Sequence, residues 1–227
     1  MRASAARLAS NGVTSQGRIG FRDLGRNGRS LRFCAILHVA RVRPRVSEAN
    51  AGGSSDVKAD SKRWTQIAAS RFAHEKEALD HLREALPDQE PYRGFSNLEF
   101  LAGDGSINEV DALVLTRKGL FLVEIKSGGG SLSGDAGTWC WKSDRRERFT
   151  ENPLFLANQK AKKLKSLLQG QKALAKLPVP YVHAVVFCSA KDLSVKLSPE
   201  GRTLVFGRDD RTELPGIGRY LTETRPE

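Results

Sequence analysis

Two consecutive apolar segments, joined by a short turn, constrain the fold of this 227-residue chain more than any other feature. They read VDALVL (110–115) and GLFLVEIK (119–126), and both have the length and composition of buried β-strands. Each carries a carboxylate among apolar side chains, Asp111 in the first and Glu124 in the second. An ionised carboxylate is costly to bury unless it is paired or binds a metal. The segments therefore predict a core hairpin whose carboxylates have a partner or a ligand.

The turn at 116–119 sets the register of this hairpin, because Gly at the last position suits a type I turn. In that register Asp111 faces Glu124, and Glu109 faces Lys126. Carboxylates directly opposite each other have Cβ atoms about 5 Å apart, and they repel unless a cation lies between them. A slip of one residue would instead move Asp111 and Glu124 to opposite faces of the sheet.

A hard divalent cation suits the predicted pair of carboxylates. Mg²⁺ binds through one or two carboxylates and keeps several waters, which leaves room for a substrate phosphate. Asp111 and Glu124 are the expected ligands of Mg²⁺, or of Mn²⁺ in its place. Lys126 lies on the same face and can stabilise the charge that develops on a phosphoryl group. The structural alternative is an ion pair between Glu124 and Lys126, with Asp111 at a solvated edge.

A helix predicted upstream can add an acidic residue to the same site. Residues 62–86 contain no Gly or Pro and are followed by Pro87, and their apolar positions recur in steps of three and four. Glu75 occupies the position in that series between Phe72 and Leu79. We expect it to point toward the core, where it could bind the metal or hold a metal-bound water. The alternative is a capping or snorkelling glutamate.

The order of the remaining segments predicts an α/β fold, with helices packed on a central mixed β-sheet in the order α-β-β-β-(β)-α-β. Strands are expected at 95–102, 137–143, 179–190 and, as a short edge, 202–206, and a Lys-rich helix is expected at 154–175. In that helix Gln159 falls outside the buried stripe that contains Ala157, Ala161 and Leu164. The Gly-rich segment 127–134 is expected to be a flexible loop beside the site.

Charge divides the chain near residue 60. Residues 1–60 carry 11 Lys and Arg against 4 Asp and Glu, whereas residues 61–227 carry 26 against 22. Most of the net charge of +11 therefore lies in the first part. A transit peptide, a nucleic-acid-binding arm and a disordered basic extension are the three interpretations of 1–60, and we favour the last. The folded domain is expected at 61–207, and a tail or short helix at 208–227.

Composition also indicates where the protein acts. The three cysteines are far apart and have no metal-ligand spacing, which is typical of a reducing, cytoplasmic setting. No apolar run approaches the about 20 residues that span a bilayer. We therefore expect a cytoplasmic protein with no membrane segment.

These motifs resemble those of the NERD (nuclease-related) domain, a branch of the PD-(D/E)xK restriction-endonuclease-like superfamily. The matching segments lie between about residues 64 and 190 and read HEKEALDHL, NEVDALVLTRKGLFLVEIKS, GTWCWKS and NPLFLANQ. The resemblance implies a restriction-endonuclease-like core, Mg²⁺, and cleavage or processing of DNA. It also implies catalytic roles for five residues of this chain, namely Glu75, Asp111, Glu124, Lys126 and Gln159.

More narrowly, the chain resembles the N-terminal part of large serine/threonine kinases of the BREX and phage-growth-limitation defence systems. The kinase itself is absent, because the sequence has no Gly-rich nucleotide loop and no HRD or DFG motif. This resemblance implies phage-defence proteins as partners and leaves open whether the chain is a fragment. The main prediction is a Mg²⁺-dependent nuclease acting on DNA. The alternatives are a catalytically weak DNA-binding or partner-docking module and a non-enzymatic scaffold.

Overall fold

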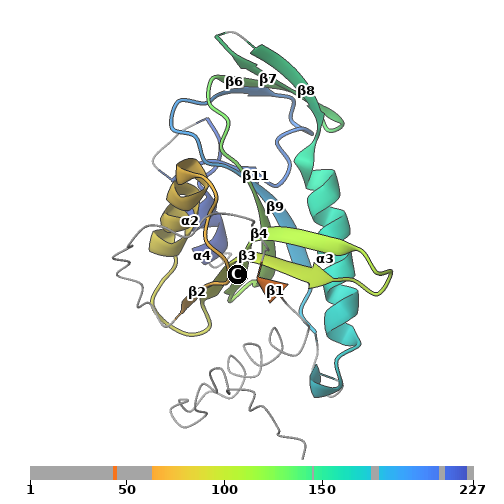
Figure 1. Ribbon diagram of the computed structural model, residues 1–227. Helices are drawn as coiled ribbons and strands as arrows, with labels where there is room; N and C mark the ends of the chain where they lie inside the picture. Colours follow the sequence, from red (N-terminus) through yellow and green to blue (C-terminus); the bar gives the residue numbers. More distant parts are fainter. Residues whose placement is uncertain (1–42, 45–62, 145, 175–178, 210–212, 224–227) are drawn as a thin grey trace, which may run out of the picture.

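The computed structural model describes residues 43–44, 63–144, 146–174, 179–209 and 213–223. A seven-stranded mixed sheet lies at its centre (Figure 1), formed by β1 (Arg43–Pro44), β2 (Trp64–Gln66), β3 (Arg93–Leu101), β4 (Ile107–Thr116), β5 (Gly119–Lys126), β9 (Val182–Cys188) and β11 (Val205–Phe206). The strand order is β1-β3-β4-β5-β9-β11, and β2 pairs with β3 beside this path. Strand β4 is antiparallel to both β3 and β5, whereas β9 is parallel to β5. The predicted mixed sheet is confirmed.

Helices cover both faces of this sheet: α2 (Ala73–Ala85), α3 (Pro153–Gln169) and α4 (Ile217–Thr222), with a 3₁₀ turn, η1 (Lys172–Leu174), after α3. Helix α3 packs on one face through the four residues that the sequence predicted, Ala157, Ala161, Leu164 and Leu168. Helices α2 and α4 pack together on the other face. None of the described helices is long and apolar enough to cross a membrane.

A second, four-stranded sheet has the order β10-β6-β7-β8 and consists of β6 (Ser131–Gly134), β7 (Thr138–Ser143), β8 (Arg146–Glu151) and β10 (Ser194–Leu197). Of these strands the sequence predicted only β7. The expectation of a flexible loop over 127–134 is wrong for its second half. Leu132 of β6 is fully buried against Trp139 of β7, and that contact fixes the segment as a strand.

The predicted start of the first helix, at residue 62, is also wrong. Residues Trp64–Gln66 form β2, which pairs in parallel with β3. The Trp64 indole lies flat on Gly94, where an added Cβ would come within 2.1 Å of the ring, and its N–H donates to Ser96 Oγ at 3.2 Å. This tertiary contact outweighs the helical preference of the segment. Helix α2 begins only after Phe72, whose side chain is 60% exposed and takes no part in the buried stripe.

The N-terminal extension lies mostly outside the described residues. Its described part is β1, where Arg43 and Pro44 pair with Glu99 and Leu98 of β3. These two residues therefore extend the sheet at β3, and the domain boundary at residue 60 stays a prediction. The backbone groups along the outer edge of β3 account for this pairing, because an exposed edge readily accepts a further strand.

The predicted register of the central hairpin is confirmed. Leu113 pairs with Leu122, Val114 with Phe121, and Thr116 with Gly119. The paired ladder ends one step before Asp111 and Glu124 and does not include Glu109 and Lys126. On its other side Glu109 pairs with Glu99 of β3.

Candidate metal centre

Asp111 lies at a break in the side-chain alternation of β4. Leu113 and Val110 both face α3, although they are an odd number of positions apart, whereas Ala112 faces α2. The pairing of β3 with β4 passes over Asp111 and its expected partner Asn97. Asn97 has a φ of +54°, a left-handed conformation that Asn tolerates better than most residues. The strands therefore kink at this point, and the Asp111 carboxylate leaves the regular ladder.

Hydrogen bonds to neighbouring segments fix both strands at the kink. The Asn97 side-chain amide donates to the Ala68 carbonyl and to Ser70 Oγ, each at 3.1 Å. Asp111 Oδ2 accepts a hydrogen bond of 2.8 Å from the backbone N–H of Ile125. That N–H belongs to the residue after Glu124, so the hydrogen bond ties Asp111 to the end of β5 where Glu124 projects.

Glu124 projects toward α3 and meets two lysines. Its side chain is only 9% exposed, and its Oε1 lies 2.9 Å from Lys126 Nζ. Its Oε2 lies 2.8 Å from Nζ of Lys160, a residue of α3 whose side chain is 12% exposed. Asp111, Glu124, Lys126 and Lys160 are called the acid–lysine cluster below.

Burial and nearby charges shift the pKa values of the two carboxylates in opposite directions. Burial, and then the negative charge of Glu124, raise the pKa of Asp111 to about 6, against the opposing effects of the Ile125 N–H and the two lysines. Burial alone would also raise the pKa of Glu124, but the charges and hydrogen bonds of Lys126 and Lys160 outweigh it and hold that pKa below its usual value. Glu124 is thus ionised at neutral pH, and Asp111 ionises only at unusual cost.

The donor set of the cluster fits a hard divalent cation. Its two acids offer only oxygen ligands, which Mg²⁺ and Mn²⁺ prefer. The two acids do not supply the nitrogen and sulfur ligands that are typical of zinc sites. No group of three or more His, Cys, Asp or Glu residues is placed to hold a metal in the part of the chain that the structure describes. An ion bound here would therefore keep several waters, as Mg²⁺ does.

The other two predicted site residues lie on helices α2 and α3. Glu75 is in the first turn of α2, and its Oε2 accepts a hydrogen bond of 3.1 Å from the backbone N–H of Arg71, which lies just before that helix. Helix α2 packs on the sheet face opposite to Glu124. Gln159 is exposed on α3, outside the buried stripe as its spacing predicted. Catalytic roles for Glu75 and Gln159 stay predictions.

Lys160 is the member of the cluster that the sequence reasoning missed, although a signal for it exists. The steps from Ala157 to Lys160 and from Lys160 to Leu164 are three and four residues, so Lys160 lies on the buried stripe of α3. A charged residue on a buried stripe requires a partner, by the reasoning that singled out Asp111 and Glu124.

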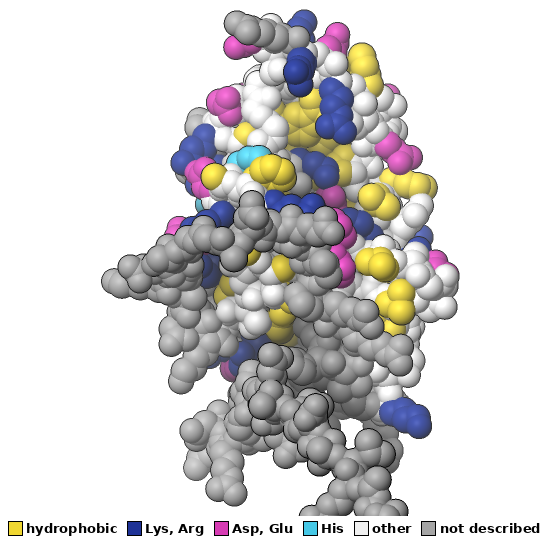
Figure 2. All heavy atoms as spheres, viewed as in Figure 1, with side chains coloured by type: hydrophobic (Ala, Val, Ile, Leu, Met, Phe, Trp, Pro, Cys, Tyr) yellow, Lys and Arg dark blue, Asp and Glu magenta, His cyan; other side chains and the backbone are white. Residues whose placement is uncertain are grey.

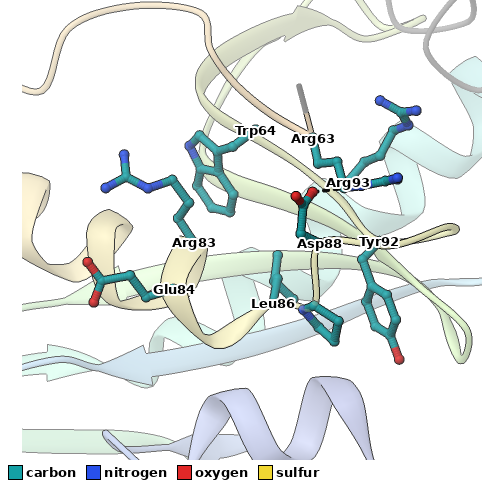
Figure 3. A pocket seen from close by; sticks show the side chains of 9 residues that line it. Arg63, Trp64, Arg83, Glu84, Leu86, Asp88, Tyr92 and Arg93 are labelled. Atoms are coloured by element: carbon teal, nitrogen blue, oxygen red, sulfur yellow. Dashed lines mark ion pairs between the residues drawn. The ribbon is translucent and has the colours of Figure 1, made fainter. Parts of the chain in front are cut away.

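A separate pocket of about 300 Å³ opens beside the C-terminal end of α2 (Figure 3). Arginines line it, and each is paired with an acid: Arg63 with Asp88 at 2.8 Å, Arg93 with Glu90 at 2.8 Å, and Arg83 with Asp80 at 2.9 Å. No residue of the acid–lysine cluster lines this pocket. Its charges are neutralised locally, and it belongs to the packing of β2 against α2.

Comparison with known proteins identifies relatives of this chain. Residues 70–189 match the family model described as "Nuclease-related domain", a range that contains all five predicted site residues. A "Probable kinase PglW" from Streptomyces coelicolor is 43% identical over 155 residues, which are 67% of this chain and 10% of that protein. The chain thus spans about a tenth of the length of this curated relative. A crystallised protein of unknown function, AF1548, aligns at 8% identity and a TM-score of 0.35 over 63% of this chain and 61% of that one, a likeness that supports no conclusion.

Proposed function

Because this chain belongs to the nuclease-related domain family, we propose that its acid–lysine cluster is the centre of a Mg²⁺-dependent nuclease that hydrolyses DNA phosphodiester bonds. One observation carries the proposal: two carboxylates and two lysines, from β4, β5 and α3, converge at the end of β5. Asp111 and Glu124 would hold the metal, Mg²⁺ or Mn²⁺. The ion would supply an acidified water and positive charge beside the phosphoryl group.

The chain's own residues have distinct roles in this proposal. Asp111 and Glu124 carry two negative charges, and Lys126 and Lys160 carry two positive ones, so the cluster has no net formal charge. The four side chains alone therefore have little attraction for a phosphate, and the attraction depends on the added cation. Lys126, whose side chain is 35% exposed, can then reach the substrate phosphate. Lys160 is more buried and holds Glu124 in its ionised form.

The test is cleavage of supercoiled plasmid, linear duplex and single-stranded DNA in Mg²⁺, in Mn²⁺ and in EDTA. We expect cleavage that requires the metal and is lost in Asp111→Asn and Lys126→Met. The matched control is Lys163→Met, because Lys163 lies on the same helix but pairs with Asp104 at 2.9 Å, outside the cluster. Cleavage that persists in EDTA or in Asp111→Asn would refute the proposal.

A catalytically weak DNA-binding or partner-docking module is the second candidate. It is favoured by the contacts of Glu124, because each of its oxygens touches a lysine and the described residues offer no third carboxylate beside it. In this case the chain would bind DNA with an affinity that falls steeply as salt rises, and no metal would produce cleavage. Measuring DNA cleavage and DNA binding on the same protein preparation distinguishes the two functions.

We propose that the protein acts in the cytoplasm and takes part in phage defence, whichever of the two activities it has. The support for defence is the similarity to the probable kinase PglW, whose kinase activity is not attributed to this chain. Support for the cytoplasm comes from Cys140 and Cys188, which are free thiols. Affinity purification of the tagged chain from a host that carries a complete defence locus tests the partnership. Recovery of other proteins of that locus is the expected result.

A further inference from the structure

The second sheet borders the acid–lysine cluster. Glu124 and Lys126 pair in the β5–β9 ladder with Val186 and Cys188, whose side chains share their face of the main sheet. Val186 and Cys188 pack against Trp139 of β7. The face of the second sheet that carries Trp139 therefore lies against the same side of the molecule as the cluster.

That face continues outward along the β7–β8 hairpin. Trp141 lies two residues beyond Trp139 on β7, and Arg148 of β8 is its direct cross-strand partner. Arg146 lies two residues before Arg148, so the period of two in a strand places Trp141, Arg146 and Arg148 on one face. We call these three residues the hairpin face.

The hairpin face contacts the segment that follows Lys126 of the cluster. Trp141 is half-buried, and a Cβ added at Gly128 would lie 3.1 Å from its ring. Gly128 follows Lys126 by two residues, so their Cα atoms are within about 7 Å of each other. The indole of Trp141 is thus close enough to the cluster to contact a nucleotide next to one bound there.

The arginines of the hairpin face are free to bind an anion. Both Arg146 and Arg148 are exposed, and neither has an ion pair or side-chain hydrogen bond within the described residues. The inner lysines of α3 and the arginines of the pocket in Figure 3 are, in contrast, paired with acids. Figure 2 shows hydrophobic side chains gathered over the second sheet with Lys and Arg side chains at their border.

We propose that the hairpin face binds an unpaired nucleic-acid strand beside the catalytic centre. A base of that strand stacks on Trp141, and Arg146 and Arg148 contact its phosphates. An aromatic side chain combined with unpaired positive charge suits single strands, because the faces of their bases are accessible. In a duplex those faces are covered by neighbouring base pairs. This inference rests on the proposed function and narrows its substrate to single-stranded or frayed DNA.

The test measures binding without cleavage. Fluorescence anisotropy of a labelled oligonucleotide in EDTA compares a single strand with a duplex of equal length, using the full chain. We expect tighter binding of the single strand, weakened on the order of tenfold by Trp141→Ala and less by Trp141→Phe. Arg148→Ala is expected to weaken binding and to reduce the slope of log affinity against log salt by about one phosphate contact.

Matched controls lie on the opposite face of the same hairpin. Lys142→Ala removes one positive charge and Phe149→Ala removes one exposed aromatic ring, and both should leave binding unchanged. Circular dichroism checks the fold of each variant. If Trp141→Ala fails to fold, Arg148→Ala against Lys142→Ala decides the question alone. The inference would be overturned if Arg148→Ala and Lys142→Ala lost equal affinity for the single strand. Equal or tighter binding of the duplex, or no binding of either oligonucleotide, would also overturn it.

Failure of this inference is separable from failure of the proposed function. Metal-dependent cleavage with binding indifferent to the hairpin face would reject the inference and keep the nuclease. Binding that depends on the hairpin face without any cleavage would support the inference and reject the nuclease.

Discussion

Replacing Asp111 by Asn removes a buried negative charge and keeps the shape of the side chain. The Asn carbonyl can still accept the hydrogen bond from the Ile125 N–H. Folded Asp111 has a pKa of about 6, against an ordinary value of 3.8. Each pKa unit corresponds to about 1.4 kcal/mol, so ionised Asp111 costs the folded state about 3 kcal/mol. We therefore expect Asp111→Asn to abolish cleavage and to stabilise the protein at pH 8.

The pH dependence of this gain follows from linkage. The folded state binds the Asp111 proton more tightly than the unfolded state does, so wild-type stability falls as the pH rises from about 4 to about 6. Asn does not titrate, and the gap between variant and wild type opens over that window. The full gain of about 3 kcal/mol should appear at pH 8, and about half of it at pH 5.

Urea denaturation followed by circular dichroism, at pH 5 and pH 8, measures the gap directly. Asp104→Asn is the matched control, because hydrogen bonds from Ser106, and then from Lys163, hold the pKa of Asp104 well below its usual range. That control should not stabilise the protein at either pH. An equal gain from Asp111→Asn at both pH values, or no gain at pH 8, would refute the assignment of Asp111 as a buried, repelled carboxylate.

Three further predictions concern the cluster and its support. Lys160→Met should raise the pKa of Glu124 and move the acid limb of the cleavage–pH profile to higher pH, whereas Lys163→Met should leave the profile in place. Mg²⁺ should raise the melting temperature of the wild type at pH 8 but not that of Asp111→Asn, because only an ion that binds the folded state stabilises it. Leu164→Ala should cost about 2–5 kcal/mol in urea denaturation, since Leu164 is fully buried between α3 and the sheet.

The central hairpin and α3 were predictable because their side-chain patterns are local. The turn at 116–119 fixes the register, and the stripe through Ala157 and Leu164 fixes the buried face of α3. The same patterns brought Asp111, Glu124 and Lys126 into one predicted site. The order of the segments predicted the mixed sheet with helices packed on it, and the family resemblance added the restriction-endonuclease-like core. The family match and the mixed sheet confirm this fold class.

What the sequence did not predict depends on contacts between distant segments. Trp64 lies in a helix-favouring segment, and only its packing on Gly94 makes that segment a strand. Strand β6 is short and follows a run of three glycines, and it gains its order from Leu132 against Trp139. The kink at Asn97 leaves no periodic signal, yet it releases Asp111 from the ladder.

The metal site itself is tested most directly by diffraction from crystals soaked in MnCl₂, with data collected near the manganese absorption edge. An anomalous difference peak about 2.1 Å from carboxylate oxygens of both Asp111 and Glu124 is the expected result. Crystals of the Asp111→Asn variant should lack that peak. A wild-type map with no peak between these two carboxylates, from protein that cleaves DNA in Mn²⁺, would contradict the account.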